Sequence, residues 1–243
     1  MPDLEKHFHL KKESDADAKA APKPLRKRKK HPVITDPLAD AKTKTGLDFQ
    51  NLQEAGDWKE FVTFHTTGEF SRLGKGYTQH CGPTAMTNLL CTLDKRKENP
   101  MVHSKTPAEI FEETASIGKR MLLYWNVKLL GFWGGSNAWF IYFYFRACMR
   151  RFGVKTQMAG FRLFTSPASA AKALEEGKIL MLQLYHHRVY GSHLLVAYGI
   201  KRLMEPGGRI RTYLMLADGW GAYPRYLALE DIKVCGFCAL KSP

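Results

Sequence analysis

The sequence has few cysteines, and they lack the regular spacing seen in a disulfide-stapled secreted domain. Its 5 cysteines are an odd number, so we expect mostly reduced thiols. The first stretch, Met1–Lys12, carries charges and no apolar run, which argues against a secretory signal there and favours a cytoplasmic location. No apolar run reaches the roughly 18–20 residues that a membrane-spanning helix needs. We therefore expect no membrane span.

Cofactor motifs are also missing or incomplete. Gly74 and Gly76 do not form a phosphate-binding loop, because the pattern of that loop and its preceding strand are absent. Cys235 and Cys238 form a single C-x-x-C pair. A thioredoxin-like motif begins a helix, and too few residues follow this pair to form one. A zinc site would need histidines at distances that the sequence does not establish. We expect neither a cofactor nor a metal.

Residues 1–45 contain almost no aromatic side chains and are rich in lysine, alanine, aspartate and proline. Such a segment cannot bury enough apolar surface to offset the entropy lost on ordering. We therefore expect a disordered basic tail over 1–45 and one folded domain over 46–243. The basic cluster Pro24–Lys30 fits a nuclear address, a contact with nucleic acid or anionic lipid, or a solvated tail. The net charge of +14 is compatible with an anionic partner bound through this tail.

The domain reads as helices followed by strands, which predicts an α+β fold with an antiparallel sheet. Apolar periodicity and capping patterns predict four helices: Cys81 to about Asp94, Pro107 to about Ile117, Ser136 to Arg151, and Pro167–Glu176. Alternation and turn residues predict four strands: Lys178–Tyr185, His193–Ile200, Thr212–Asp218 and Val234–Leu240. The aromatic-rich region 124–145 fits either buried core or the wall of a substrate cleft.

One cysteine lies where a glycine-containing loop turns into an apolar helix. In Gly76-Tyr-Thr-Gln-His-Cys81-Gly-Pro-Thr-Ala85, Pro83 suits the first helical turn, which places Cys81 at the helix N-terminus. Unpaired N–H groups and the positive end of the helix dipole favour an anion there. A thiol in that position has a lowered pKa and raised reactivity. Cys81 is therefore a candidate nucleophile.

A candidate base and its orienting group come from two later strands. We expect the strands that contain His193 and Asp218 to pair antiparallel. A turn centred between Glu205 and Pro206 would then place these two residues opposite each other. A carboxylate beside a histidine fixes the ring tautomer and raises its basicity. The sequence therefore supplies a nucleophile, a base and an orienter.

The segments Gln79–Ala85, Gly191–Val196 and Leu216–Trp220 resemble those of papain-like cysteine peptidases, most nearly the bacteriocin-leader-processing type, over about residues 70–240. The resemblance implies a papain-like fold in which Cys81 attacks the scissile carbonyl, His193 acts as base and acid, and Asp218 orients His193.

The family usually places an oxyanion-stabilising glutamine six residues before the cysteine, and Lys75 stands at that position here. Gln79 is then the candidate oxyanion residue, together with the backbone N–H of Cys81.

These features predict a cysteine hydrolase that cleaves a peptide or amide bond in a peptide or protein through an acyl-enzyme on Cys81. Transfer of the same acyl group to an amine is an alternative reaction. A catalytically weak peptide-binding domain is a second alternative, suggested by Lys75. A third is a nucleic-acid-associated protein that holds phosphate through its basic residues.

Overall fold

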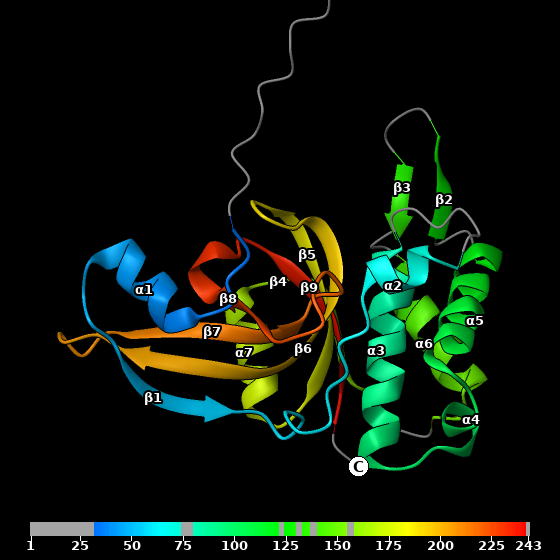
Figure 1. The fold of residues 1–243 in the computed structure, drawn as a ribbon, viewed down its shortest axis with the longest axis horizontal. Helices are drawn as coiled ribbons and strands as arrows, with labels where there is room; N and C mark the ends of the chain where they lie inside the picture. The colour runs from blue at the N-terminus through cyan, green and yellow to red at the C-terminus, as the bar shows by residue number, and fades with distance from the viewer. Residues whose placement is uncertain are drawn as a thin grey trace, which may run out of the picture. The chain divides into compact units, whose positions relative to one another are not determined.

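A computed structural model describes residues 32–73, 80–121, 124–129, 133–136, 140–154 and 158–241. Gln79, Lys75 and the basic cluster of the tail lie outside these residues. The described elements belong to one compact unit, which covers residues 31–243. They form an α+β fold of helices and a large antiparallel sheet (Figure 1), as predicted.

The helices and strands follow one another along the chain as a mixture rather than in two blocks. The helices are α1 (Pro37–Thr45), α2 (Thr67–Ser71), α3 (Cys81–Arg96), α4 (Pro100–His103), α5 (Pro107–Arg120), α6 (Ile141–Arg151), α7 (Pro167–Glu175) and the short 3-10 helix η2 (Leu229–Asp231). The strands are β1 (Gln50–Ala55), β2 (Tyr124–Leu129), β3 (Trp133–Ser136), β4 (Met158–Thr165), β5 (Ile179–His187), β6 (Gly191–Met204), β7 (Ile210–Ala217), β8 (Arg225–Ala228) and β9 (Cys235–Leu240).

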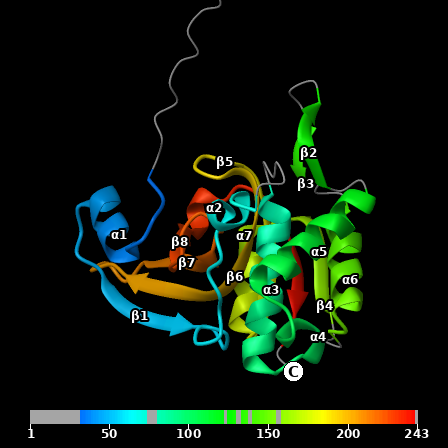
Figure 2. The same ribbon diagram turned by 45° about the vertical axis from the view of Figure 1, so that its right-hand side comes forward.

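The large sheet has the strand order β4-β9-β5-β6-β7-β8, and β1 pairs with the far half of β6. Every pairing in it is antiparallel. Because alternate residues of a strand face opposite sides, the apolar residues of β5 and β6 divide between two cores. One core joins the sheet to α3, α5 and α6, and the other joins it to α7. Figure 2 shows the helices α3 to α6 grouped on one side of the molecule.

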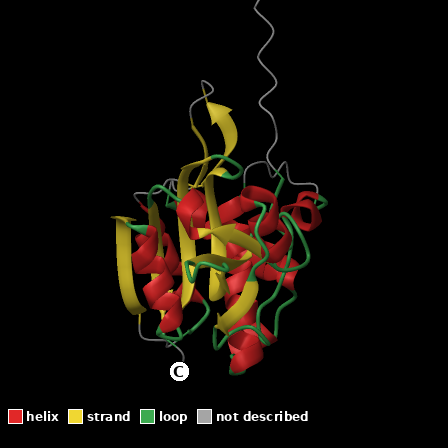
Figure 3. Ribbon diagram, turned by 90° about the vertical axis from the view of Figure 1, so that its left-hand side faces the viewer, coloured by secondary structure: helices red, strands yellow, loops and turns green. Residues whose placement is uncertain are grey.

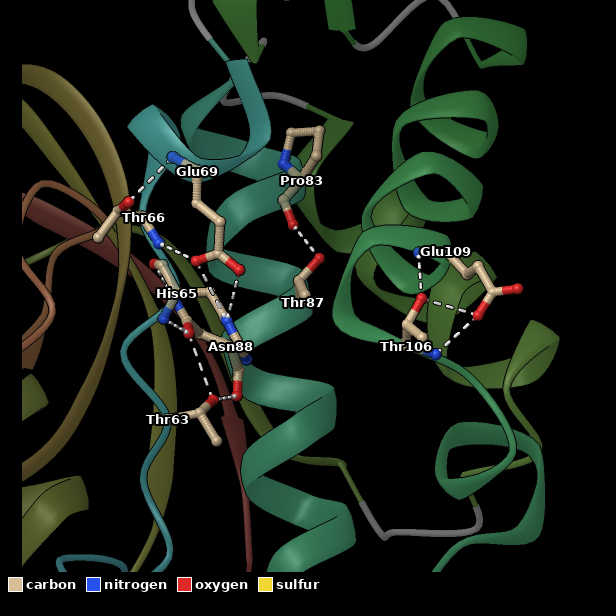
Figure 4. Close-up of polar contacts among 9 residues, drawn as sticks. All are labelled: Thr63, His65, Thr66, Glu69, Pro83, Thr87, Asn88, Thr106 and Glu109. Carbon is tan, nitrogen blue, oxygen red and sulfur yellow. Dashed lines mark hydrogen bonds and ion pairs between the residues drawn. The ribbon is translucent and has the colours of Figure 1, made fainter. Parts of the chain in front are cut away.

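Helix α3 lies against the sheet and is buried over nearly its whole first half, including Thr84, Thr87 and Asn88. Asn88 holds the extended segment that precedes α2 (Figure 4). Its Oδ1 accepts from the N–H of His65 at 2.7 Å, and its Nδ2 donates to the His65 carbonyl at 2.9 Å. The hydroxyl of Thr63 donates to the Asn88 carbonyl at 2.9 Å. These buried polar groups therefore satisfy one another.

The folded part begins before the predicted boundary at residue 46. Ile34 already pairs with Tyr226, and α1 occupies the last nine residues of the predicted disordered tail. Asp36 caps this helix, and Gly46 ends it in the left-handed conformation. Ala41 packs with residues of the sheet, and the Tyr213 hydroxyl donates to Asp40 at 2.9 Å. These tertiary contacts stabilise the helix, which its polar composition does not predict.

The predicted helix from Ser136 to Arg151 is too long at its start. Ser136 ends strand β3, which pairs with β2 in a separate two-stranded sheet (Figure 3), and α6 begins at Ile141. The β2–β3 segment is rich in aromatic residues and glycine, a composition that favours a hairpin over a helix. Strands β1, β4 and β8 were not predicted either.

Candidate active site

Cys81 is the first residue of α3, and His80 is the N-cap without a side-chain cap bond. The thiol is partly exposed. Burial by itself would raise the pKa of Cys81. Hydrogen bonding and the charge of His193, with the N–H groups of Leu194 and Gly82, outweigh burial and lower the pKa below its ordinary value. The helix start and His193 thus favour the thiolate form of Cys81.

His193, the third residue of β6, is buried and pairs with Cys81. Its Nε2 lies 2.7 Å from the carbonyl oxygen of Asp218. A carbonyl can only accept, so Nε2 carries the proton and Nδ1 is left to face the sulfur. Burial would lower the pKa of His193, but its hydrogen bond and charge interaction with Cys81, the Asp218 carbonyl and the charge of Asp218 together raise it overall. The shifts of both groups favour the imidazolium–thiolate pair.

The Asp218 carboxylate makes no hydrogen bond to His193, in contrast to the orienting bond predicted from the sequence. Its Oδ1 accepts from the N–H groups of Trp220 and Gly221, at 2.8 and 3.2 Å. Its Oδ2 accepts from the hydroxyl of Tyr190 at 3.1 Å. The side chain therefore shapes the turn that follows β7, and the main-chain carbonyl of Asp218 holds the base.

The strand register explains this difference. In the structure Val196 lies opposite Ala217, and Ala197 opposite Leu216. Continuing this register would bring Asp218 opposite Leu195, two residues from the predicted partner His193. The turn is centred near Gly207, which alone would move the partner of Asp218 three residues from His193. The register shift between Ala197 and Gly199 reduces this offset to two residues.

Two aromatic side chains surround the His193 ring. Tyr190 stacks on it with ring centroids 5.5 Å apart and planes at 15°. Trp220 contacts it at 4.9 Å and also contacts Tyr190 at 4.8 Å. Trp220 is 44% exposed, so it lies between these two rings and solvent. Tyr190 belongs to no motif, and only its place three residues before His193 could have suggested a role.

Thr67, at the start of α2, joins the two halves of the site. Its N–H donates to the Gly219 carbonyl at 2.7 Å, next to Asp218. Its carbonyl accepts from Nε2 of His80 at 3.0 Å, next to Cys81. His80 is buried, and its ring meets Phe111 edge-on at 5.3 Å. Figure 2 shows α2 beside the start of α3. This connection was also missed, because neither glycine nor threonine at these positions forms a motif.

The structure brings Cys81, His193 and Asp218 together, while Gln79 lies outside the described residues. The other four cysteines differ from Cys81, because burial raises the pKa of each thiol. Within the described ranges, no group of three or more histidine, cysteine or acidic side chains is arranged to hold a metal ion.

Comparison with protein-family models, curated proteins and solved structures gave no match. None of the described helices is both long and apolar enough to cross a membrane.

Proposed function

We propose that the protein is a papain-like cysteine hydrolase that cleaves a peptide or amide bond. The observation that carries this proposal is the pairing of Cys81, at the start of a buried helix, with His193, whose other ring nitrogen is held by a main-chain carbonyl. An activated nucleophile, a base and a fixed orientation for the base are the parts that acyl transfer requires.

The reaction follows from these positions. The Cys81 thiolate attacks the substrate carbonyl and forms a carbon–sulfur bond, and the oxygen takes the negative charge. His193 gives the Nδ1 proton to the leaving amine as the carbon–nitrogen bond breaks, which leaves a thioester. His193 then takes a proton from water, and the hydroxide displaces Cys81 and releases the acid. An amine in place of water would give an acyl transferase with the same residues.

The proposal is tested by iodoacetamide labelling at pH 6.5, with the labelled cysteine identified by mass spectrometry. Wild type is compared with His193→Ala and with His103→Ala, which removes an exposed histidine outside the site. We expect rapid labelling at Cys81 in wild type and His103→Ala. His193→Ala should label at least tenfold more slowly, because an unpaired buried thiol stays protonated.

Labelling of Cys81 at the rate of an ordinary thiol, unchanged by His193→Ala, would contradict the proposal. It would favour the alternative of a non-catalytic peptide-binding domain. A positive result would justify screening peptide libraries and amine acceptors, which separates hydrolysis from acyl transfer.

A further inference from the structure

The region around α6 and the edge strand β4 has an unusual charge composition. Between Glu113 and Glu175 the sequence contains no aspartate or glutamate, although it contains 9 lysines and arginines. The acidic residues of the chain therefore all lie outside this stretch. Helix α6 and strand β4 lie wholly inside it. The stretch between Glu113 and Glu175 therefore contributes lysines and arginines to the surface of α6 and β4, and no carboxylates.

Aromatic rings of α6, β4 and β5 form two groups of contacts that share strand β4. Tyr142 of α6 contacts Phe143 at 5.4 Å and Phe161 of β4 at 4.9 Å. Phe164, farther along β4, contacts Tyr185 of β5 at 5.0 Å. We call these five side chains the ring row.

A glycine allows the row to continue from β4 to β5. Strand β9 lies between them, and its Gly236 has no side chain at this point. The Tyr185 hydroxyl therefore reaches across β9 and donates to the Leu163 carbonyl at 2.8 Å. A Cβ at Gly236 would lie 2.3 Å from that carbonyl oxygen, so any side chain there would break the row.

The outer rings of the row are exposed. Phe143 and Phe164 have exposed fractions of 55% and 54%. Phenylalanine has no polar atom that would gain from contact with water. An exposed aromatic ring in each of the two groups therefore favours a site for a partner.

Arginines flank the ring row. The guanidinium of Arg146 lies 5.6 Å over the ring of Tyr142 and donates to its hydroxyl at 3.3 Å. Arg150 is one turn farther along the same exposed face of α6. Neither of these two guanidinium groups forms an ion pair within the described part of the chain.

We propose that the ring row and its arginines bind single-stranded nucleic acid. Bases stack on exposed aromatic rings without regard to sequence, and guanidinium groups bind the phosphates that follow the same line. Two groups of exposed rings with arginines beside them suit a polyanion that carries a ring and a charge in each repeat. This binding is independent of the proposed hydrolase.

The test is fluorescence anisotropy of a labelled 20-nucleotide poly(U) or poly(dT) strand with the full chain at 50 mM salt. The Phe143→Ala/Phe164→Ala variant removes two rings and keeps every charge, including those of the basic tail. Leu52→Ala/Ile210→Ala is the matched control, because it removes two equally exposed apolar side chains elsewhere. We expect the ring variant to lose about tenfold or more in affinity. The control and Phe143→Tyr/Phe164→Tyr should bind like wild type.

A second variant tests the charges. Arg146→Gln/Arg150→Gln should reduce the slope of log affinity against log salt by about 1.4, because roughly 0.7 is expected for each phosphate contact to a single strand. Equal binding by wild type and the ring-less variant would overturn the proposal. Equally tight binding of polyphosphate, which has no bases, would overturn it too, as would binding of anionic vesicles without binding of either strand.

Discussion

The N–H of Thr67 donates to the carbonyl of Gly219 at 2.7 Å, which places the start of α2 directly against the turn after Asp218. The carbonyl of Thr67 meanwhile accepts from His80, the residue before Cys81. Thr67 therefore links the segment next to Cys81 with the segment next to Asp218, while Cys81 also accepts directly from the N–H of Leu194. Asn88 fixes the chain just before Thr67, so the buried core of α3 supports this arrangement.

The pH dependence of Cys81 labelling should separate the effect of His193 from that of burial. His193 lowers the pKa of the thiol, whereas burial raises it. In wild type we expect the labelling rate to rise through an inflection below the ordinary thiol pKa. In His193→Ala burial acts with less opposition, so the inflection should move upward. Stopped-flow labelling from pH 4 to 10 measures both pH profiles. The same inflection in wild type and in His193→Ala would contradict an ion pair between Cys81 and His193.

Asp218→Asn should leave the reactivity of Cys81 within about tenfold of wild type. The carbonyl that holds His193 remains, and an amide oxygen can still accept from the Trp220 and Gly221 N–H groups. Where a carboxylate orients the histidine, the same change costs about 10⁴ in rate. Asp218→Ala should lose more than Asp218→Asn, because the turn loses its acceptor. A loss near 10⁴ for Asp218→Asn would show that the carboxylate does act on His193.

Gly219→Ala should damage both stability and the site. Gly219 has a φ of +74°, and an added Cβ would lie 3.0 Å from Cγ2 of Thr84, in the first turn of α3. Gly208→Ala is the matched control, because Gly208 has a φ of +80° and nothing within 4 Å of such a Cβ. Both variants should lose about 1 kcal/mol from backbone strain. Urea denaturation should show a larger loss for Gly219→Ala, and only this variant should slow Cys81 labelling.

Asn88→Ala should destabilise the fold by about 2–4 kcal/mol, since it leaves buried backbone groups of His65 and the Thr63 hydroxyl with fewer partners. Asn51→Ala, at an exposed position of β1, should change stability by less than about 0.5 kcal/mol. Urea denaturation followed by circular dichroism measures both. Similar losses for the two variants would mean that Asn88 does not hold the segment before α2.

The sequence predicts the parts of this fold whose signals are local. Capping residues and apolar periodicity locate α3 and α5, and alternation locates β5, β6, β7 and β9. Strand β1 is polar and largely exposed, so only its contacts with the sheet reveal it. Helix α1 has local signals in Asp36, Pro37 and Gly46, but they do not outweigh the polar composition of the tail.

Local signals also predict only part of the candidate site. Helix position identifies Cys81, and the strand pattern identifies His193. The role of Asp218 depends on the register of β6 and β7, which shifts beside Gly199. A Cβ on Gly199 would lie 2.7 Å from the Ala55 carbonyl, so the close approach of another strand occurs at this irregularity. A contact between segments so far apart in the chain leaves no local signal.

The half-exposed indole of Trp220 against the His193 ring gives the protein an optical property of its own. An imidazolium quenches indole fluorescence more strongly than a neutral imidazole does. The emission of Trp220 should therefore brighten when His193 loses its proton, and the difference from Trp220→Phe would isolate this signal from the other tryptophans. Occupation of the site by a substrate would change the same emission, so the fluorescence of Trp220 could report binding before any product is known.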